Sequence, residues 1–351
     1  MRERKNVVLL FSKVPETGLV KTRLSVLKDG MFPPETAAHL YHCMLFDVVE
    51  IICAALADLE ARADADAAGA SAGAGAAGAG AGAAGATGAG AGAADATGAG
   101  AGAAGAGAGA AGATGAGAGA AGATGAGAGA AGAGVKDTYE LVISTTPASN
   151  VEVMRKLFED AGEWPRPITF IADEGADFDE HYNHAFQQCW DRGADCILSM
   201  GADMPALTKA DVRFGFEQLH RLCNMPDGGI VLAPDQEMGV SVIGWTRETD
   251  FSHTGVFYNR EGLTVLPAYI HKASNAGLPA LWLPPIPDVD TMADFFHNVT
   301  LVHALAYCAG SDDICPPWRT AKAFAELGFR EVRVAPNDLR DPRNHIDTPQ
   351  Q

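Results

Sequence analysis

The feature that most constrains the fold of this chain is a tract from Ala65 to Gly134 that consists almost entirely of alanine and glycine. These side chains bury little apolar surface, and each glycine disfavours a helix by about 1 kcal/mol relative to alanine. The tract cannot offset the conformational entropy lost on ordering, so we expect a disordered insertion. The folded core must then come from about 280 of the 351 residues, on both sides of the tract.

A second interpretation of the tract is a silk-like segment that associates with itself, because alternating glycine and alanine can pack into flat, stacked sheets. The repeat is broken irregularly by GAAGATG units, which disfavours such stacking. Loop-closure entropy grows slowly with length, so a long insertion is tolerable at an exposed connection between a helix and a strand.

Outside the tract, short apolar runs alternate with segments of helical periodicity, as in crossover units. This order predicts an α/β fold with a doubly wound, mostly parallel sheet and helices on both faces. The expected strands are 7–11, 140–145, 168–172, 196–200, 230–233, 240–245 and 280–283, and the expected helices are 34–60, 151–161, 179–192, 208–222, 261–276, 292–307 and 318–327.

A basic loop follows the first expected strand. It contains Lys13, Pro15, Gly18, Lys21 and Arg23, in a chain that is otherwise acidic. Glycine lets backbone N–H groups approach an anion closely, and cations neutralise its charge, so the loop is a candidate phosphate site. The alternative is a set of solvated surface cations. The loop has neither the P-loop pattern nor the G-x-G-x-x-G pattern.

Carboxylates follow later strands of the expected sheet. Asp203 comes after the run 196–200, and Asp288 and Asp290 follow the last strand. Ligands of such sheets bind beyond the carboxyl ends of the strands, where Mg²⁺ takes one or two carboxylates plus phosphate oxygens. Asp203 is therefore a candidate metal ligand, or alternatively a turn or cap residue. Asp290 is a candidate ligand, or the N-cap of the next helix.

Two further local signals mark loop and helix boundaries. Thr208 with Asp211 three residues later resembles a capping box at the start of a helix. The loop from Pro234 to Gly239 carries Asp235 and Glu237, which border the acceptor or lie in a solvated loop.

The formal net charge is −18, which argues against binding to nucleic acid or to an anionic membrane. The seven cysteines are dispersed without a C-x-x-C spacing, as expected of buried thiols in a reducing compartment. The run from Val7 to Phe11 is too short for a signal peptide, and no run approaches the length of a membrane span. We therefore expect a soluble cytoplasmic protein; the sequence leaves its oligomeric state open.

The motifs resemble those of an uncharacterised glycosyltransferase-A-like family, a domain of unknown function. The opening motif K-x-P-x-x-G-x-V-K-T-R-L runs from Lys13 to Leu24, and the mid-chain motif G-x-D-x-P-x-L-T runs from Gly201 to Thr208. The segment from Val231 to Gly239 matches more loosely, with Gln-Glu-Met-Gly in place of the family's Asp-Gly-Gly-Tyr. The closing motif D-V-D-T ends at Thr291.

The wider superfamily includes nucleotide-diphospho-sugar transferases and the related 2-phospholactate guanylyltransferase. The resemblance implies a glycosyltransferase-A-like fold and a site that binds a nucleotide or nucleotide-sugar and a small acceptor. It implies that Lys13, Gly18, Lys21 and Arg23 bind the nucleotide and that Lys21 acts in catalysis. It also implies that Asp203 is catalytic and that Asp203 and Asp290 hold Mg²⁺ or Mn²⁺.

These expectations divide the chain into four parts. Residues 1–64 begin the glycosyltransferase-A-like domain, 65–134 are the insertion, 135–310 complete the domain, and 311–351 are a C-terminal extension. The expected function is metal-dependent glycosyl transfer. The alternatives are nucleotidyl transfer of the 2-phospholactate guanylyltransferase type and a degenerate, non-catalytic nucleotide-binding or interaction protein.

Overall fold

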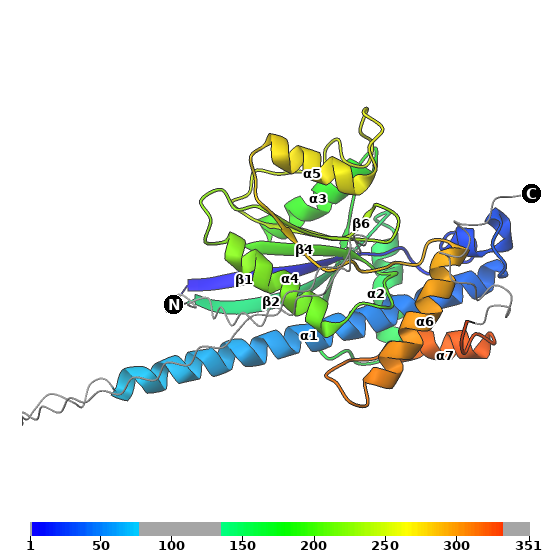
Figure 1. Ribbon diagram of the computed structural model, residues 1–351, viewed down its shortest axis with the longest axis horizontal. Coiled ribbons are helices and arrows are strands. Elements are labelled where there is room, and N and C mark those ends of the chain that lie inside the picture. The colour runs from blue at the N-terminus through cyan, green and yellow to red at the C-terminus, as the bar shows by residue number, and fades with distance from the viewer. Residues whose placement is uncertain (1, 77–134, 333–351) are drawn as a thin grey trace, which may run out of the picture. The chain divides into compact units, whose positions relative to one another are not determined.

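The structure, a computed structural model, describes residues 2–76 and 135–332 (Figure 1). Within these residues, seven strands form one sheet in the order β3-β2-β1-β4-β6-β5-β7. Every neighbouring pair is parallel except the two pairs that include β6. The predicted mostly parallel α/β sheet is thus confirmed. The strands are β1 (Arg2–Phe11), β2 (Val135–Thr145), β3 (Ile168–Ala172), β4 (Cys196–Gly201), β5 (Ile230–Pro234), β6 (Val240–Thr246) and β7 (Ala280–Trp282).

Helices cover both faces of this sheet. One core cluster joins alternate strand residues such as Leu10 to α1, α2, α4, α6 and α7, and the other joins Leu9 to α3 and α5. Figure 1 shows α3 and α5 on the opposite side of the sheet from α1. The helices are α1 (Pro34–Ala76), α2 (Asn150–Asp160), α3 (Phe178–Asp191), α4 (Lys209–Leu222), α5 (Val265–Asn275), α6 (Met292–Cys308) and α7 (Trp318–Glu326).

Helix α1 is longer than predicted. It continues beyond Glu60 into the first residues of the alanine-glycine tract and ends at Ala76. The reason is that alanine is the best helix former and glycine is sparse at the start of the tract. The rest of the insertion, 77–134, lies outside the described residues, and its disorder stays a prediction.

The same helix contains a run that the sequence analysis overlooked. The segment Pro34–Ala65 is long and apolar enough to cross a membrane, the only such helix among the described residues. However, 78% of its most apolar window is buried inside the protein. Residues such as Leu40, Met44 and Ile52 pack against the sheet, so the apolar run is explained by its place in the core.

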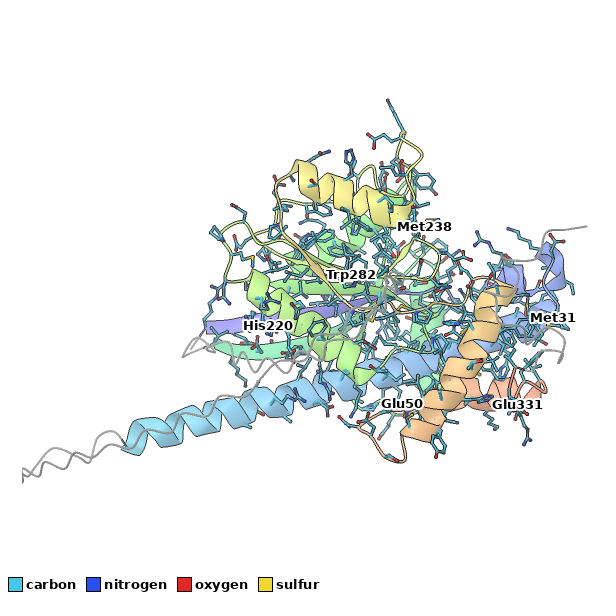
Figure 2. The ribbon with its side chains drawn as sticks, in the orientation of Figure 1. Met31, Glu50, His220, Met238, Trp282 and Glu331 are labelled. Atoms are coloured by element: carbon cyan, nitrogen blue, oxygen red, sulfur yellow. The ribbon has the colours of Figure 1, made fainter. Side chains whose placement is uncertain are left out.

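The segment after residue 310 is part of the core as far as it is described. In α7, Phe324 is fully buried, and the Thr320 backbone N–H donates to Asp47 of α1 at 2.7 Å. Arg319 forms an ion pair with Glu50, which lies on α1 beside α7 (Figure 2). The apolar face of α7 therefore packs on the core, the predicted division at residue 310 stays a prediction, and 333–351 lie outside the description.

The cysteines differ from expectation in one respect. All seven are free thiols, but only Cys53, Cys189 and Cys196 are buried, whereas Cys223 and Cys308 are exposed. Both lie where a helix ends, at the C-cap of α4 and in the last residue of α6.

Strand register brings the candidate residues to one edge of the sheet. Phe11 at the end of β1 pairs with Ser144 of β2 and with Gly201 of β4, so these three strands end level. Because β6 is antiparallel, its first residues lie at the same edge, where Val240 pairs with Pro234. The loops after β1, β4 and β5 therefore surround one crevice, as parallel sheets favour.

Candidate active site

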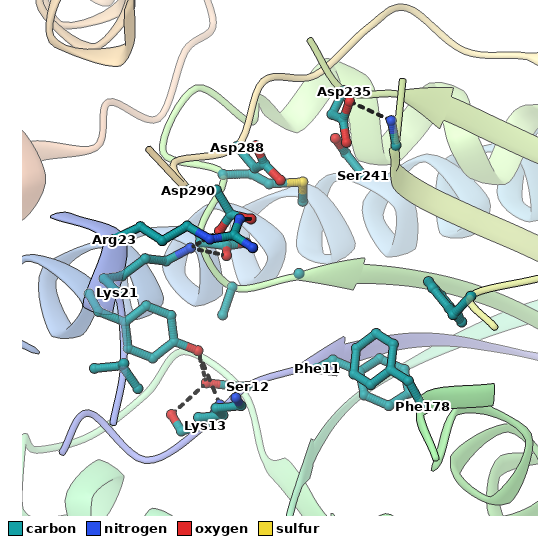
Figure 3. A pocket seen from close by; sticks show the side chains of 18 of the residues that line it. Phe11, Ser12, Lys13, Lys21, Arg23, Phe178, Asp235, Ser241, Asp288 and Asp290 are labelled. Carbon is teal, nitrogen blue, oxygen red and sulfur yellow. Dashed lines mark hydrogen bonds and ion pairs between the residues drawn. The ribbon is translucent and has the colours of Figure 1, made fainter. Parts of the chain in front are cut away.

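A cleft of about 650 Å³ lies at this edge of the sheet. Its lining comes from the loop after β1 and from the ends of β2, β3, β4 and β5, and its volume suits a small-molecule site. Figure 3 shows Lys21, Arg23, Asp288 and Asp290 on one side of the cleft and Phe11 and Phe178 on the other. The lining includes the predicted Lys13, Lys21, Arg23, Asp203 and Asp290.

Lys21 is at the centre of the charged side. Its Nζ donates to a carboxylate oxygen of Asp203 and, at 2.8 Å, to Oδ1 of Asp290. Its side chain is only 6% exposed. Burial by itself would lower the pKa of the amine, but the two carboxylates outweigh burial and raise it. The ammonium is therefore fixed in its charged form between two residues that the sequence predicted as metal ligands.

The backbone of Lys21 has an uncommon conformation for a residue with a side chain. Its φ is 46° and its ψ is 39°, in the left-handed region. Non-glycine residues held there usually carry a local strain of about 1–3 kcal/mol and cluster at functional sites. Here the conformation accompanies the buried ion pairs with Asp203 and Asp290.

Arg23 extends the cationic side towards solvent. Its Nη1 lies 3.4 Å from Oδ2 of Asp290, and its side chain is 61% exposed. Burial would raise the pKa of Asp290, but Lys21, Arg23 and Lys13 together hold it below its usual range. Three of the predicted cations thus act on one carboxylate.

Asp288 has the opposite electrostatic environment. Burial, with the negative charges of Asp203 and Asp290, raises the pKa of Asp288 to about 7. Its Oδ1 accepts a hydrogen bond of 2.9 Å from Nε2 of Gln236, which also donates to Asp294 at 2.7 Å. Negative charge is therefore concentrated in this part of the cleft beyond what Lys21 neutralises.

The alternative roles of the carboxylates are resolved by the caps of α4 and α6. Thr208 caps α4 in a capping box with Asp211, as predicted. Thr291 caps α6 in a second capping box with Asp294, so Asp290 is not the N-cap. Neither Asp203 nor Asp290 serves as a helix cap, and both are free to face the cleft.

Tyr41 of α1 is a site residue that sequence reasoning missed. Its hydroxyl lies 2.9 Å from Oγ of Ser12 and accepts the backbone N–H of Lys13 at 3.1 Å. Its ring lies 5.9 Å from Nζ of Lys21. Tyr41 thus touches both ends of the basic loop. Sequence periodicity indicated only that Tyr41 lies on the buried face of the helix.

An aromatic wall, made of Phe11, Phe178, Tyr182 and Phe257, forms the other side of the cleft. The rings of Phe11 and Tyr182 are stacked with centroids 3.8 Å apart, and Phe178 contacts Tyr182 edge-on at 4.9 Å. Phe178 is 43% exposed although it is apolar. These residues are scattered over three segments, and no pattern in the sequence joined them.

Beside the aromatic wall lies a buried polar group that was also not predicted. Asp173, at the end of β3, accepts hydrogen bonds from Oγ of Ser144 and pairs with Nδ1 of His181, both at 2.7 Å. Asp173 and Ser144 line the cleft. No pattern in the sequence assigned a role to His181 or to its partner Asp173.

Gly18 and Asp235, two loop residues singled out from the sequence, differ in their position relative to the cleft. Gly18 does not line the cleft; its φ of 78° identifies it as a turn residue of the loop. Its predicted contact with a nucleotide stays a prediction. Asp235 does line the cleft, and its Oδ1 accepts the backbone N–H groups of Glu237 at 2.6 Å and Gly239 at 2.7 Å.

The carboxylates of the cleft are candidate metal ligands. Among residues 2–76 and 135–332, no three His, Cys, Asp or Glu side chains form a metal-binding group. Asp203 and Asp290 nevertheless converge on a single point, where the Lys21 ammonium lies. Two carboxylates satisfy Mg²⁺ if phosphate oxygens and water complete its shell. The residues therefore fit a metal that arrives with a phosphate ligand, and not a preformed protein cage.

Comparison with known proteins supports the fold. The sequence model of the family described as "Uncharacterized protein conserved in bacteria (DUF2064)" matches residues 132–260. This segment includes the motif from Gly201 to Thr208, whereas the opening and closing motifs lie outside it. A search among curated proteins gave no match.

Among solved structures, a protein from Desulfovibrio desulfuricans G20, whose name assigns it to the nucleotide-diphospho-sugar transferases, is similar with a TM-score of 0.52 and 20% identity. The alignment covers 93% of this chain and 99% of that one. A cytidylyltransferase from Leptospira borgpetersenii aligns with a TM-score of 0.32 and 9% identity, over 56% of this chain and 80% of that one.

The predicted resemblance is thus confirmed at two levels. The chain has the glycosyltransferase-A-like fold of the nucleotide-diphospho-sugar transferases, and over residues 132–260 its sequence resembles the family DUF2064.

Proposed function

We propose that this protein is a metal-dependent transferase that binds a nucleotide-sugar in the cleft and transfers the sugar to a small acceptor. The observation that carries the proposal is the position of Lys21 between Asp203 and Asp290, at the edge of the sheet where such folds bind ligands. A buried cation beside two convergent carboxylates suits a phosphate ligand accompanied by a divalent ion.

The two sides of the cleft suit the two ends of a nucleotide. Lys13, Lys21 and Arg23 would bind the phosphates through charge-assisted hydrogen bonds. The stacked rings of Phe11 and Tyr182 offer a flat surface to a base, since base–aromatic stacking contributes about 1–3 kcal/mol. The acceptor would then lie towards the remaining side of the cleft, near Asp235 and Ser241 (Figure 3).

Asp203 and Asp290 would hold Mg²⁺ or Mn²⁺ once Lys21 turns to phosphate. The metal would supply stabilisation of the negative charge on the departing nucleoside diphosphate. Lys21 and Arg23 would stabilise the same charge from the protein side, because preorganised cations in a buried site act strongly on developing charge. Tyr41 would hold Lys13 and the start of the loop in place.

Nucleotidyl transfer from a nucleoside triphosphate is the second candidate. It is favoured by the number of cations, because Lys28 also lines the cleft beside Lys13, Lys21 and Arg23. Four cations suit three phosphates at least as well as two. In that reaction, an acceptor oxygen would attack the α-phosphorus and pyrophosphate would leave.

One experiment separates these chemistries. The purified protein is incubated with Mn²⁺ and either nucleotide-sugars or nucleoside triphosphates, with a panel of small hydroxy and phosphorylated acceptors. Release of nucleoside diphosphate with formation of a glycosylated acceptor supports the first proposal, and release of pyrophosphate supports the second. If neither is released while nucleotide still binds, the protein is a non-catalytic nucleotide-binding protein.

A further inference from the structure

Lys21 and a divalent cation require the same two carboxylates. Nζ of Lys21 bonds to one oxygen of Asp203 and one of Asp290, and no other ammonium or guanidinium group in the described chain contacts both. A metal ion at that point would be repelled by an ammonium at hydrogen-bonding distance. The two cations therefore cannot occupy this position together.

The ammonium cannot leave without a new anionic partner. The Lys21 side chain is 6% exposed, and a buried, unpaired charge is strongly unfavourable. Within the described residues, the other acidic groups in the cleft are already engaged: Asp288 by Gln236, Asp235 by backbone N–H groups, and Asp173 by Ser144 and His181. A phosphate group entering beside Lys13 and Arg23 would provide the missing partner.

We propose that Lys21 occupies the cation-binding carboxylates until a nucleotide phosphate draws its ammonium away, so that metal binding depends on the nucleotide. The proposal rests on the proposed function, because it assumes a phosphate ligand. Lys21 would then make the metal bind after the nucleotide, a role that is separate from its stabilisation of charge during transfer. Metal alone binds weakly, and metal with nucleotide binds well.

Thermodynamic linkage makes this dependence reciprocal. If the nucleotide strengthens metal binding by some factor, the metal strengthens nucleotide binding by the same factor. Removal of the Lys21 charge removes the competitor. A neutral residue at position 21 should therefore increase the affinity for metal alone while weakening the affinity for nucleotide. These opposite changes in the two affinities are specific to competition, since a residue that only supported the fold would weaken both affinities.

The test measures Mn²⁺ binding by water-proton relaxation, which distinguishes free Mn²⁺, Mn²⁺ bound to protein and the ternary complex. The proteins are the wild type, Lys21→Met, Lys28→Met and the double variant Lys21→Met with Asp203→Asn. Lys28 is the matched control because it lines the cleft but bonds to neither carboxylate among the described contacts. Each protein is titrated alone and with GDP, UDP or CDP.

We expect Lys21→Met to bind Mn²⁺ alone at least tenfold more tightly than the wild type. Lys28→Met should change the affinity less than threefold, and the double variant should lose the gain. Wild-type Mn²⁺ affinity should rise at least tenfold when one of the nucleotides is present. The wild-type measurement needs no substitution, so it tests the proposal even if Lys21→Met fails to fold.

Two results would overturn the inference, and they differ in what they say of the proposed function. If the wild type binds Mn²⁺ equally with and without nucleotide, or Lys21→Met binds it no more tightly, the competition is absent while the nucleotide site stands. If no folded protein in the set binds Mn²⁺ or any nucleotide, the proposed function falls as well.

Discussion

The charged and aromatic sides of the cleft are built in different ways. On the charged side, Lys21, Asp203 and Asp290 come from three distant loops and are joined by ion pairs. On the aromatic side, Phe11 and Tyr182 are joined by ring stacking. We therefore expect the charged side to be sensitive to the loss of any one ion-pair partner, and the aromatic side to act through contact area.

The largest expected effect is that of Asp203→Ala on the charged side. Loss of one carboxylate would remove a partner of Lys21 and a proposed metal ligand, so we expect turnover to fall by about two to three orders of magnitude. Steady-state assays with the active donor measure it. Glu237→Ala, on the exposed turn after β5, is the control and should keep near-normal turnover. Full metal-dependent activity in Asp203→Ala would remove Asp203 from the mechanism.

On the aromatic side, Tyr182→Ala should act on affinity and leave metal binding intact. Loss of a stacking surface costs about 1–3 kcal/mol, which is roughly 5- to 150-fold in the dissociation constant of the nucleotide. Calorimetric titration measures it, with Tyr258→Ala as control because Tyr258 is 64% exposed and does not line the cleft. An equal loss in both variants would mean that the wall does not bind the base.

The contrast between the two sides also explains what sequence could predict. Lys13, Lys21, Arg23 and Asp203 each lie in a short motif after a recognisable strand, so their convergence followed from the rule that parallel strands end at one edge. The position of Asp290 at this edge followed from the same rule, because Asp290 comes after the last expected strand. What was not foreseen is that Lys21 would bond to both carboxylates, because the side-chain geometry across three distant loops is not contained in the motifs.

The residues of the aromatic wall lie in no sequence motif that predicts a ligand site. Phe178 and Tyr182 read as ordinary helix residues, and Phe257 lies in an irregular loop after β6. Helical periodicity places Tyr41 on the core face of α1, where it is buried, but its hydroxyl contacts with Ser12 and Lys13 cannot be read from periodicity. Long-range side-chain contacts of this kind appear only once the sheet register is known.

The raised pKa of Asp288 makes the stability of the folded protein depend on pH. Because the pKa of Asp288 is about 7 in the folded protein and 3.8 when unperturbed, the fold favours its protonated form. Its contribution to stability is present below about pH 4 and is lost as the pH rises through 7. Asp288→Asn should therefore raise the unfolding temperature by a few degrees more at pH 8 than at pH 5. A constant difference between the two pH values would contradict the raised pKa.

The smallest effect should come from Tyr41→Phe. The substitution removes the hydroxyl that contacts Ser12 and Lys13 while keeping the ring in the core. A lost hydrogen bond contributes about 1 kcal/mol, which lowers the unfolding temperature of a domain of this size by about 3 °C. Thermal unfolding followed by circular dichroism checks this. No change would show that the basic loop is positioned by its ion pairs alone.

Thermal unfolding with a ligand panel shows whether this cleft binds a nucleotide together with a divalent metal. The panel contains the nucleoside triphosphates and the common UDP-, GDP- and dTDP-sugars, each with and without Mn²⁺. A ligand at about a hundred times its Kd stabilises by roughly 2.7 kcal/mol, enough for a clear shift. We predict a shift of several degrees that requires both the metal and one nucleotide or nucleotide-sugar. The absence of any shift across the panel, in protein shown to be folded, would contradict the claim.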